Sequence, residues 1–170
     1  MSEIRRQATL FLYGKEPVDL IRETYNPVQA NLIGSHVTLC REDEVADWEA
    51  FGRKLVSKSL ESVTLHFGKP LRKGELVYLP CIGPTDDFDR LRATLLSDST
   101  VPPRKHDPHI TLVHPRNGVC SSGDFEEMSA AIEPFTYIFD EVSFIAQIGS
   151  GGWEVIETFR LAGVEKTNDT

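Results

Sequence analysis

His36-Val37-Thr38-Leu39 and, much further along the chain, His109-Ile110-Thr111-Leu112 are two copies of one tetrapeptide pattern. Side chains in a β-strand alternate between its two faces. The histidine and the threonine of each copy therefore share one face, and the two aliphatic residues share the other. Each copy therefore predicts a strand with one buried aliphatic face and an opposite face that carries an imidazole and a hydroxyl.

The elements around the two copies repeat in the same order. Each copy is preceded by a strand and a helix and is followed by one helix and then two strands. Hydrophobic periodicity predicts helices at 17–24, 45–55, 85–95 and 125–132, with a loop around Asn26, Pro27 and Gly34. Strands are expected at 8–13, 36–41, 63–67, 75–82, 109–114, 135–148 and 153–161.

Two copies are too few for a stacked solenoid, so the repeat predicts two similar lobes. We expect an α+β fold in which a single bilobal domain spans residues 1–170. In this fold, two antiparallel β-sheets related by pseudo-two-fold symmetry are flanked by helices and face each other across a central cleft.

If the lobes face each other, the imidazoles of His36 and His109 and the hydroxyls of Thr38 and Thr111 converge on that cleft. Histidine, with an ordinary pKa of about 6.5, can take or give a proton near neutral pH. Threonine hydroxyls can donate hydrogen bonds to phosphate oxygens. The pattern favours phosphoryl transfer with two histidines as acid and base, two threonines as phosphate ligands, and no metal or cofactor.

These motifs resemble those of the 2H phosphoesterase superfamily, which includes cyclic phosphodiesterases and 2′-5′ RNA ligase-like proteins. The residues that carry the resemblance are His36-Val37-Thr38-Leu39, Pro108-His109-Ile110-Thr111-Leu112 and Trp153-Glu154-Val155. One departure is that Ser35, and not proline, precedes the first histidine. The resemblance implies a hydrolase of 2′,3′-cyclic or related cyclic nucleotide phosphates, with His36 and His109 catalytic and Thr38 and Thr111 binding phosphate. Two alternatives stay open: a 2′-5′ RNA ligase or RNA-end processing enzyme, and a non-catalytic protein that binds nucleotides or RNA ends.

Composition and charge narrow the partners. With a net charge of −8, the protein as a whole repels nucleic acid, so a long-duplex partner is not expected. A small nucleotide or an RNA end could bind in a locally basic cleft, and Arg41, Arg104, Lys105 and Arg116 lie close to the two tetrapeptides in sequence.

No apolar run is long enough to span a membrane. The three cysteines have no Cys-x-x-Cys spacing, which is typical of free thiols in the cytoplasm. We expect a monomer.

Other residues are candidates for lesser roles. Tyr13, Tyr78, His114 and Trp153 are candidate substrate-binding residues, because aromatic rings stack on bases. His106, His109 and His114 would form a zinc site only if all three met, and a regular strand places His114 on the face opposite His109. Cys40 falls on the face of His36, so a hydrolase with a cysteine nucleophile is a further alternative. His66 is expected to be structural.

Overall fold

In the computed structural model, which describes residues 3–98 and 103–162, the strands form two antiparallel sheets. The smaller sheet pairs β3 (Val63–Phe67) with β7 (Phe135–Phe139). The larger sheet has seven strands, in the spatial order β4 (Leu71–Lys73), β5 (Leu76–Pro80), β6 (His109–Val113), β2 (His36–Arg41), β1 (Ile4–Phe11), β8 (Glu141–Ile148) and β9 (Trp153–Arg160). The ends of the expected domain, 1–2 and 163–170, lie outside the described residues.

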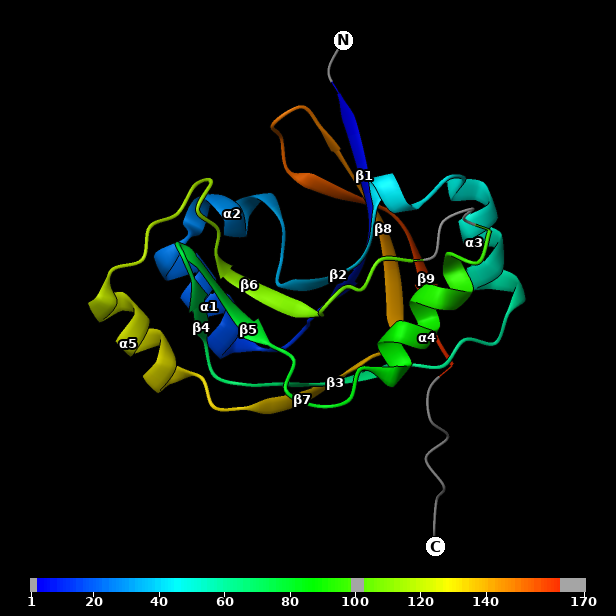
Figure 1. Ribbon diagram of the computed structural model, residues 1–170. Helices are drawn as coiled ribbons and strands as arrows, with labels where there is room; N and C mark the ends of the chain where they lie inside the picture. Colours follow the sequence, from blue (N-terminus) through cyan, green and yellow to red (C-terminus); the bar gives the residue numbers. More distant parts are fainter. Residues whose placement is uncertain (1–2, 99–102, 163–170) are drawn as a thin grey trace, which may run out of the picture.

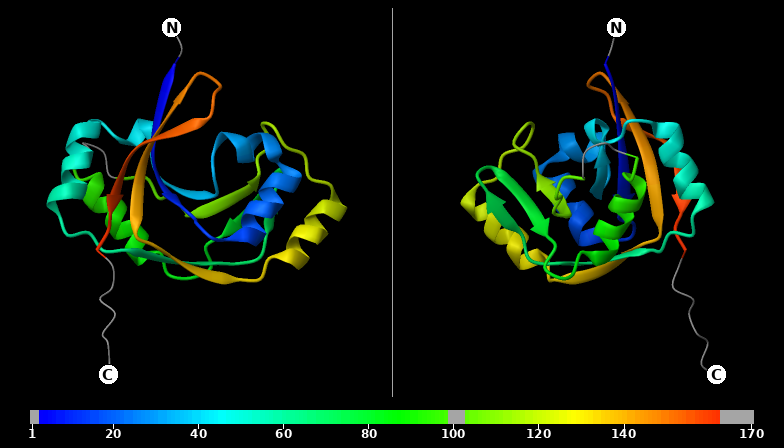
Figure 2. Two further views of the ribbon diagram at one scale, coloured as in Figure 1. Left: turned by 180° about the vertical axis from the view of Figure 1, so that it is seen from behind. Right: turned by 45° about the vertical axis from the view of Figure 1, so that its right-hand side comes forward.

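The helices flank the larger sheet on two sides (Figures 1 and 2). The helices α1 (Glu16–Tyr25), α2 (Pro27–Leu32) and α5 (Ser122–Ala131) lie beside β4, β5 and β6, and α3 (Trp48–Ser57) and α4 (Asp86–Leu95) lie on the side of β1, β8 and β9. A short 3₁₀-helix, η1 (Glu42–Glu44), follows β2. The expected α+β fold with antiparallel sheets is thus confirmed.

The predicted repeat appears as two halves of the larger sheet. In one half Thr9 of β1 pairs with Thr38 of β2, and in the other half Tyr78 of β5 pairs with Thr111 of β6. Both pairings are interrupted by an irregularity of the β-bulge type immediately beyond this point. The same register and the same bulge on both sides are the structural trace of the pseudo-two-fold relation.

The two halves join where Val37 of β2 pairs with Ile110 of β6. The two lobes therefore share one sheet, whereas the sequence predicted one sheet in each lobe. This pairing satisfies backbone groups that would otherwise remain unpaired at two strand edges. It also places the second residue of one tetrapeptide opposite the second residue of the other.

Each lobe contains segments from both halves of the chain. Helix α1, which follows β1, packs against β6, and helix α4, which follows β5, packs against β2 and β3. Deep burial of Ile21 in α1 and of Phe88 and Leu91 in α4 anchors these contacts. The lobes are consequently not consecutive units of sequence.

Four features differ from the expectation. The expected loop at Pro27 contains α2, because proline fits the first turn of a helix. The segment expected as one strand at 135–148 is divided into β7 and β8 around Asp140, and each part joins a different sheet. Strand β4 was missed because its three residues are too few to show a period. Helix α3 begins only at Trp48 because the Asp47 carboxylate accepts hydrogen bonds from the first free backbone amides.

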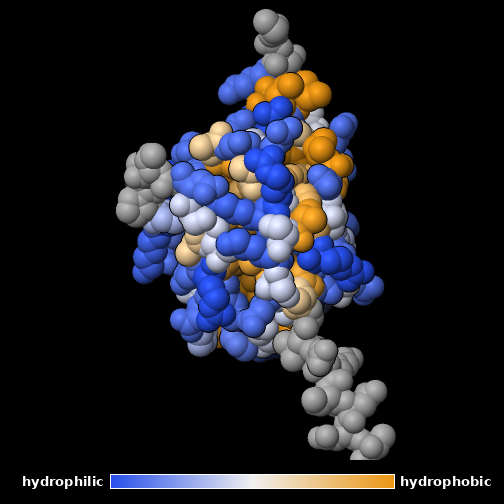
Figure 3. Space-filling view, turned by 90° about the vertical axis from the view of Figure 1, so that its right-hand side faces the viewer, coloured by the Kyte–Doolittle hydropathy of each residue, from blue (hydrophilic) through white to orange (hydrophobic). Residues whose placement is uncertain are grey.

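The outer surface on the side of α3 and α4 is mainly polar. Figure 3 shows a largely hydrophilic face on the side of α3 and α4, with hydrophobic residues in scattered patches. Among the exposed apolar side chains are Ile4 and Ile148, which pair across β1 and β8, and Val155 and Ile156 of β9. Within the described residues, no helix has the length and apolar character that crossing a membrane requires.

Candidate active site

The pairing of β2 with β6 brings the two tetrapeptides together. The aliphatic residues Val37, Leu39, Ile110 and Leu112 are buried in the core. On the opposite face, the four polar side chains line one cavity of about 650 Å³: His36, Thr38, His109 and Thr111. The structure therefore brings together all four residues for which the sequence predicted catalysis or phosphate binding.

Both imidazoles are held by the same kind of hydrogen bond. His36 Nδ1 lies 2.8 Å from the carbonyl oxygen of Gly34, and His109 Nδ1 lies 2.9 Å from that of Asp107. A carbonyl oxygen can only accept, so Nδ1 carries the proton in each ring. In the neutral ring, Nε2 is then the nitrogen that can accept a proton, as a general base requires.

Burial, together with the positive charge of Arg22 and the proximity of His109, lowers the pKa of His36 to about 4, although the hydrogen bond to the Gly34 carbonyl acts in the opposite direction. His36 is therefore neutral at pH 7. Arg22 extends from α1 and is buried, and its guanidinium donates to the Ile33 carbonyl at 2.9 Å. No sequence pattern marked this arginine, because nothing in α1 shows which strand it will pack against.

Gln7 of β1 orients one of the phosphate-binding hydroxyls. Its Nε2 donates to Thr38 Oγ1 at 3.1 Å and to Thr9 Oγ1 at 2.8 Å. Because Thr38 Oγ1 accepts this bond, its own hydrogen is free to be donated into the cavity. Gln7 was not among the predicted site residues, although alternation along β1 places it on the same face as Thr9.

The cavity is basic although the protein is acidic. The charged residues along its wall are Arg5, Arg6, Arg22, Arg41 and Arg116, with Glu42 and Asp43 as the acids. Of the basic residues expected near the tetrapeptides, Arg41 and Arg116 line this cavity, while Arg104 forms ion pairs with Asp43 and Glu44. Such a wall favours an anionic ligand.

The bulges determine which of the residues directly after each tetrapeptide line the cavity. A bulge shifts the alternation of a strand by one residue. Cys40, which was expected beside His36, is instead completely buried, and Arg41 lines the cavity. The equivalent irregularity on the other side buries Val113 and returns His114 to the cavity, where a regular strand would have turned it away. Burial raises the pKa of Cys40 to about 12, which removes it as a nucleophile.

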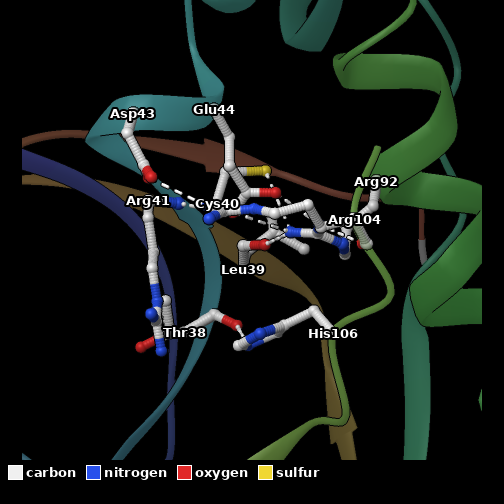
Figure 4. Close-up of polar contacts among 9 residues, drawn as sticks. All are labelled: Thr38, Leu39, Cys40, Arg41, Asp43, Glu44, Arg92, Arg104 and His106. Atoms are coloured by element: carbon white, nitrogen blue, oxygen red, sulfur yellow. Dashed lines mark hydrogen bonds and ion pairs between the residues drawn. The ribbon is translucent and has the colours of Figure 1, made fainter. Parts of the chain in front are cut away.

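A buried ion pair supports β2 from behind (Figure 4). Arg92 of α4 forms an ion pair with Glu44 at 2.5 Å, and both side chains are almost fully buried. The Arg92 guanidinium also donates to the carbonyl oxygens of Leu39 and Arg104. Beside it, His106 Nε2 donates to the Thr38 carbonyl at 3.1 Å. This network joins α4 and the segment before β6 to β2.

His106 is thus engaged with the backbone of β2, and burial lowers its pKa to about 4, helped by the charge of Arg92. His114 Nδ1 accepts from the backbone amide of Arg116 at 3.1 Å. In the described ranges, no three His, Cys, Asp or Glu side chains come together as a metal site would require. His66 lies on the β3–β7 ribbon, 2.7 Å from Thr136 Oγ1.

The three remaining candidate substrate-binding residues lie in different places. Trp153 lines the cavity, and the guanidinium of Arg5 lies 5.4 Å from its ring centre. Tyr78 packs against His109, with ring centres 5.7 Å apart, but lines a second, neighbouring cavity. Tyr13 lines neither of these cavities. Its side chain is exposed, and its backbone amide donates a hydrogen bond to the Tyr137 hydroxyl at 2.8 Å.

Comparison with known proteins identifies solved structures that have a similar fold. No protein-family model and no curated protein matches the sequence. Among solved structures, apo E. coli LigT is similar, with a TM-score of 0.62 and 16% identity over 95% of this chain and 99% of LigT. A structure described as a phosphoesterase has a TM-score of 0.61 and 16% identity, over 94% of this chain and 99% of its own. LigT complexed with 3′-AMP has a TM-score of 0.60 and 16% identity, over 95% and 99%. The chain therefore has the fold of E. coli LigT, which fits the fold that its paired tetrapeptides predict.

Proposed function

We propose that this protein is a 2H phosphoesterase that hydrolyses 2′,3′-cyclic or related cyclic nucleotide phosphates. The observation that carries the proposal is the convergence of His36, His109, Thr38 and Thr111 on one basic cavity. The fold supports it, because structures of LigT, which has the same fold, are described as complexes with 3′-AMP, ATP, NADP+ and phosphate.

In the proposed reaction, water attacks the phosphorus of the cyclic phosphate and one ribose oxygen leaves. His36 is the proposed base, because its neutral ring has Nε2 available to take the proton of the water. His109 then gives a proton to the departing ribose oxygen, and the product is a phosphomonoester. Neither proton transfer requires a metal ion.

Thr38 and Thr111 donate hydrogen bonds to the non-bridging oxygens, where negative charge must be stabilised in the transition state. The arginines along the wall add a positive field that favours the phosphate over neutral ligands. We also propose that the enzyme works in the cytoplasm, since Cys40, Cys81 and Cys120 are all free thiols.

The test is incubation with the four 2′,3′-cyclic nucleotides and with ADP-ribose cyclic phosphate, in the presence and absence of EDTA. We expect conversion of at least one of them to a monoester, unaffected by EDTA. His36→Ala and His109→Ala should each lower turnover by about 10²–10⁴-fold with an unchanged circular dichroism spectrum. Binding without turnover by the wild type would favour the non-catalytic alternative, and full activity of either variant would overturn the proposed mechanism.

A further inference from the structure

A buried arginine recurs at the same place in the two repeats. Helices α1 and α4 have ten residues each, and Arg22 and Arg92 lie at the same distance from the first residue of their helix. Each helix precedes one of the two tetrapeptide strands. Both side chains are almost fully buried, with exposed fractions of 4% for Arg22 and 3% for Arg92. The pseudo-two-fold relation makes the two positions equivalent, so the surroundings of the two guanidinium groups can be compared directly.

Arg92 is neutralised within the protein. It forms an ion pair with the buried Glu44 at 2.5 Å, and its other hydrogen bonds go to backbone carbonyl oxygens (Figure 4). It does not line the cavity that contains the two tetrapeptides, whereas Arg22 does. In the part of the chain that the structure describes, Arg22 donates to the Ile33 carbonyl at 2.9 Å and to the Ser35 hydroxyl at 3.4 Å, and no carboxylate contacts it. Only the arginine beside the cavity thus lacks a direct ionic partner.

Ser35 links Arg22 to a carboxylate that it does not contact. The Ser35 hydroxyl accepts from Arg22 and donates to Asp19 Oδ1 at 2.5 Å. Before the second histidine, Pro108 takes the place of Ser35. Proline has no hydroxyl, so this link exists only in the half that contains Arg22. The departure from proline at Ser35 therefore has a structural consequence, which is to fix the position of the guanidinium.

The electrostatics at Arg22 favour an anionic ligand. Burial lowers the pKa of its guanidinium, and the charge of Asp19 opposes this effect only in part. A buried charge without a contacting partner is costly, and an anion in the cavity would remove that cost. A guanidinium has five N–H donors, so the bonds to Ile33 and Ser35 leave donors for a ligand. Its charge also acts on the ring of His36, so it lies close to the proposed site of reaction.

We propose that Arg22 is a third phosphate ligand, which binds a non-bridging oxygen beside Thr38 and Thr111. An arginine can hold a phosphate with charge-assisted hydrogen bonds, and these strengthen as negative charge develops in the transition state. Asp19 and Ser35 are positioning residues that act through Arg22. The inference rests on the proposed function and adds to it a ligand from outside the two tetrapeptides.

The experiment compares the dissociation constants of 3′-AMP and adenosine in titration calorimetry. In Arg22→Gln we expect that of 3′-AMP to rise about tenfold or more, because a hydrogen bond to a charged group is lost. The value for adenosine, which has no phosphate, should stay unchanged. Arg6→Gln is the matched control: it removes the same charge from the same cavity wall, but from an exposed side chain that solvent screens. We expect this control to cost less than about threefold.

Turnover separates this inference from the proposed function. If the wild type binds 3′-AMP through Arg22 but hydrolyses no cyclic nucleotide, the inference stands and the proposed function fails. If cyclic nucleotides are hydrolysed, kcat/KM should fall in Arg22→Gln at least as much as the affinity for 3′-AMP does.

Four results would overturn the inference. They are a wild type that does not bind 3′-AMP, an unchanged affinity for 3′-AMP in Arg22→Gln, an equal loss in Arg6→Gln, and an equal loss of affinity for adenosine, which would show a structural role. If circular dichroism shows that Arg22→Gln does not fold, Ser35→Ala decides. This variant removes the link to Asp19 and should raise the dissociation constant of 3′-AMP about fivefold, and an unchanged value would equally exclude the proposed role.

Discussion

Gln7→Glu tests whether the hydrogen-bond direction at Thr38 matters for phosphate binding. Gln7 Nε2 donates to Thr38 Oγ1 at 3.1 Å, which leaves the threonine hydrogen for the phosphate. A carboxylate at this position can only accept, so the Thr38 hydroxyl would turn its hydrogen away from the cavity. The variant changes no side chain that contacts the phosphate in the proposed complex.

The magnitude follows from this geometry. A phosphate oxygen bonded to Thr38 would lie roughly 6 Å from the new carboxylate, and the repulsion at an effective dielectric constant of about 20 is about 3 kcal/mol. The lost hydrogen bond adds about 1 kcal/mol. Together they correspond to a fall in kcat/KM on the order of 10²–10³-fold. Gln7→Ala, which loses only the neutral hydrogen bond, should cost about fivefold.

The assay is steady-state hydrolysis of a 2′,3′-cyclic nucleotide, and Gln29→Glu is the matched control. Gln29 lines the same cavity, and its Oε1 accepts from Asn117 Nδ2 at 2.8 Å, a bond that a carboxylate keeps. This control adds the same charge without touching Thr38, and we expect it to cost less than about tenfold. Equal losses in the two glutamate variants would refute the reasoning, because the effect would then be one of charge alone.

Three further predictions concern pH, stability and salt. Since burial lowers the pKa of His36 to about 4, kcat/KM should hold as the pH falls from 6.5 to about 5 and should decline only near pH 4; a midpoint near 6.5 in the measured pH profile would contradict this role. Because the folded state favours the neutral ring of His36, protonation of this ring lowers the free energy of unfolding. The stabilisation from the neutral ring is complete above pH 6.5 and is lost as the pH falls toward 4. Glu44→Gln leaves the buried Arg92 without its ionic partner and should lower the free energy of unfolding by about 3–5 kcal/mol in urea titrations, whereas Asp43→Asn, at an exposed pair, should cost at most about 1 kcal/mol; equal costs would show that the buried pair has no special weight. Affinity for a cyclic mononucleotide should depend weakly on salt, and a steep fall between low and physiological salt would indicate many phosphate contacts and a larger RNA ligand.

The periodic segments of the chain were predictable. The strand at His36–Arg41 has the bounds that the alternation predicted, and the strand at Val63–Phe67 does as well. The helix around Phe88 and Leu91 was recognisable from its apolar spacing. Short or irregular elements were not, because α2 and β4 contain too few residues to establish a period.

The sequence by itself determined the four central side chains, since alternation within a strand is a local property and one chemical pattern occurs twice. Only the tertiary structure decided what surrounds them. The bulges that bury Cys40 and bring His114 into the cavity arise from the pairing of neighbouring strands. Gln7 and Arg22 reach the cavity because β1 pairs with β2 and α1 packs against the sheet. Such contacts join residues far apart in the chain, and a local pattern contains no information on which distant segment will lie beside it.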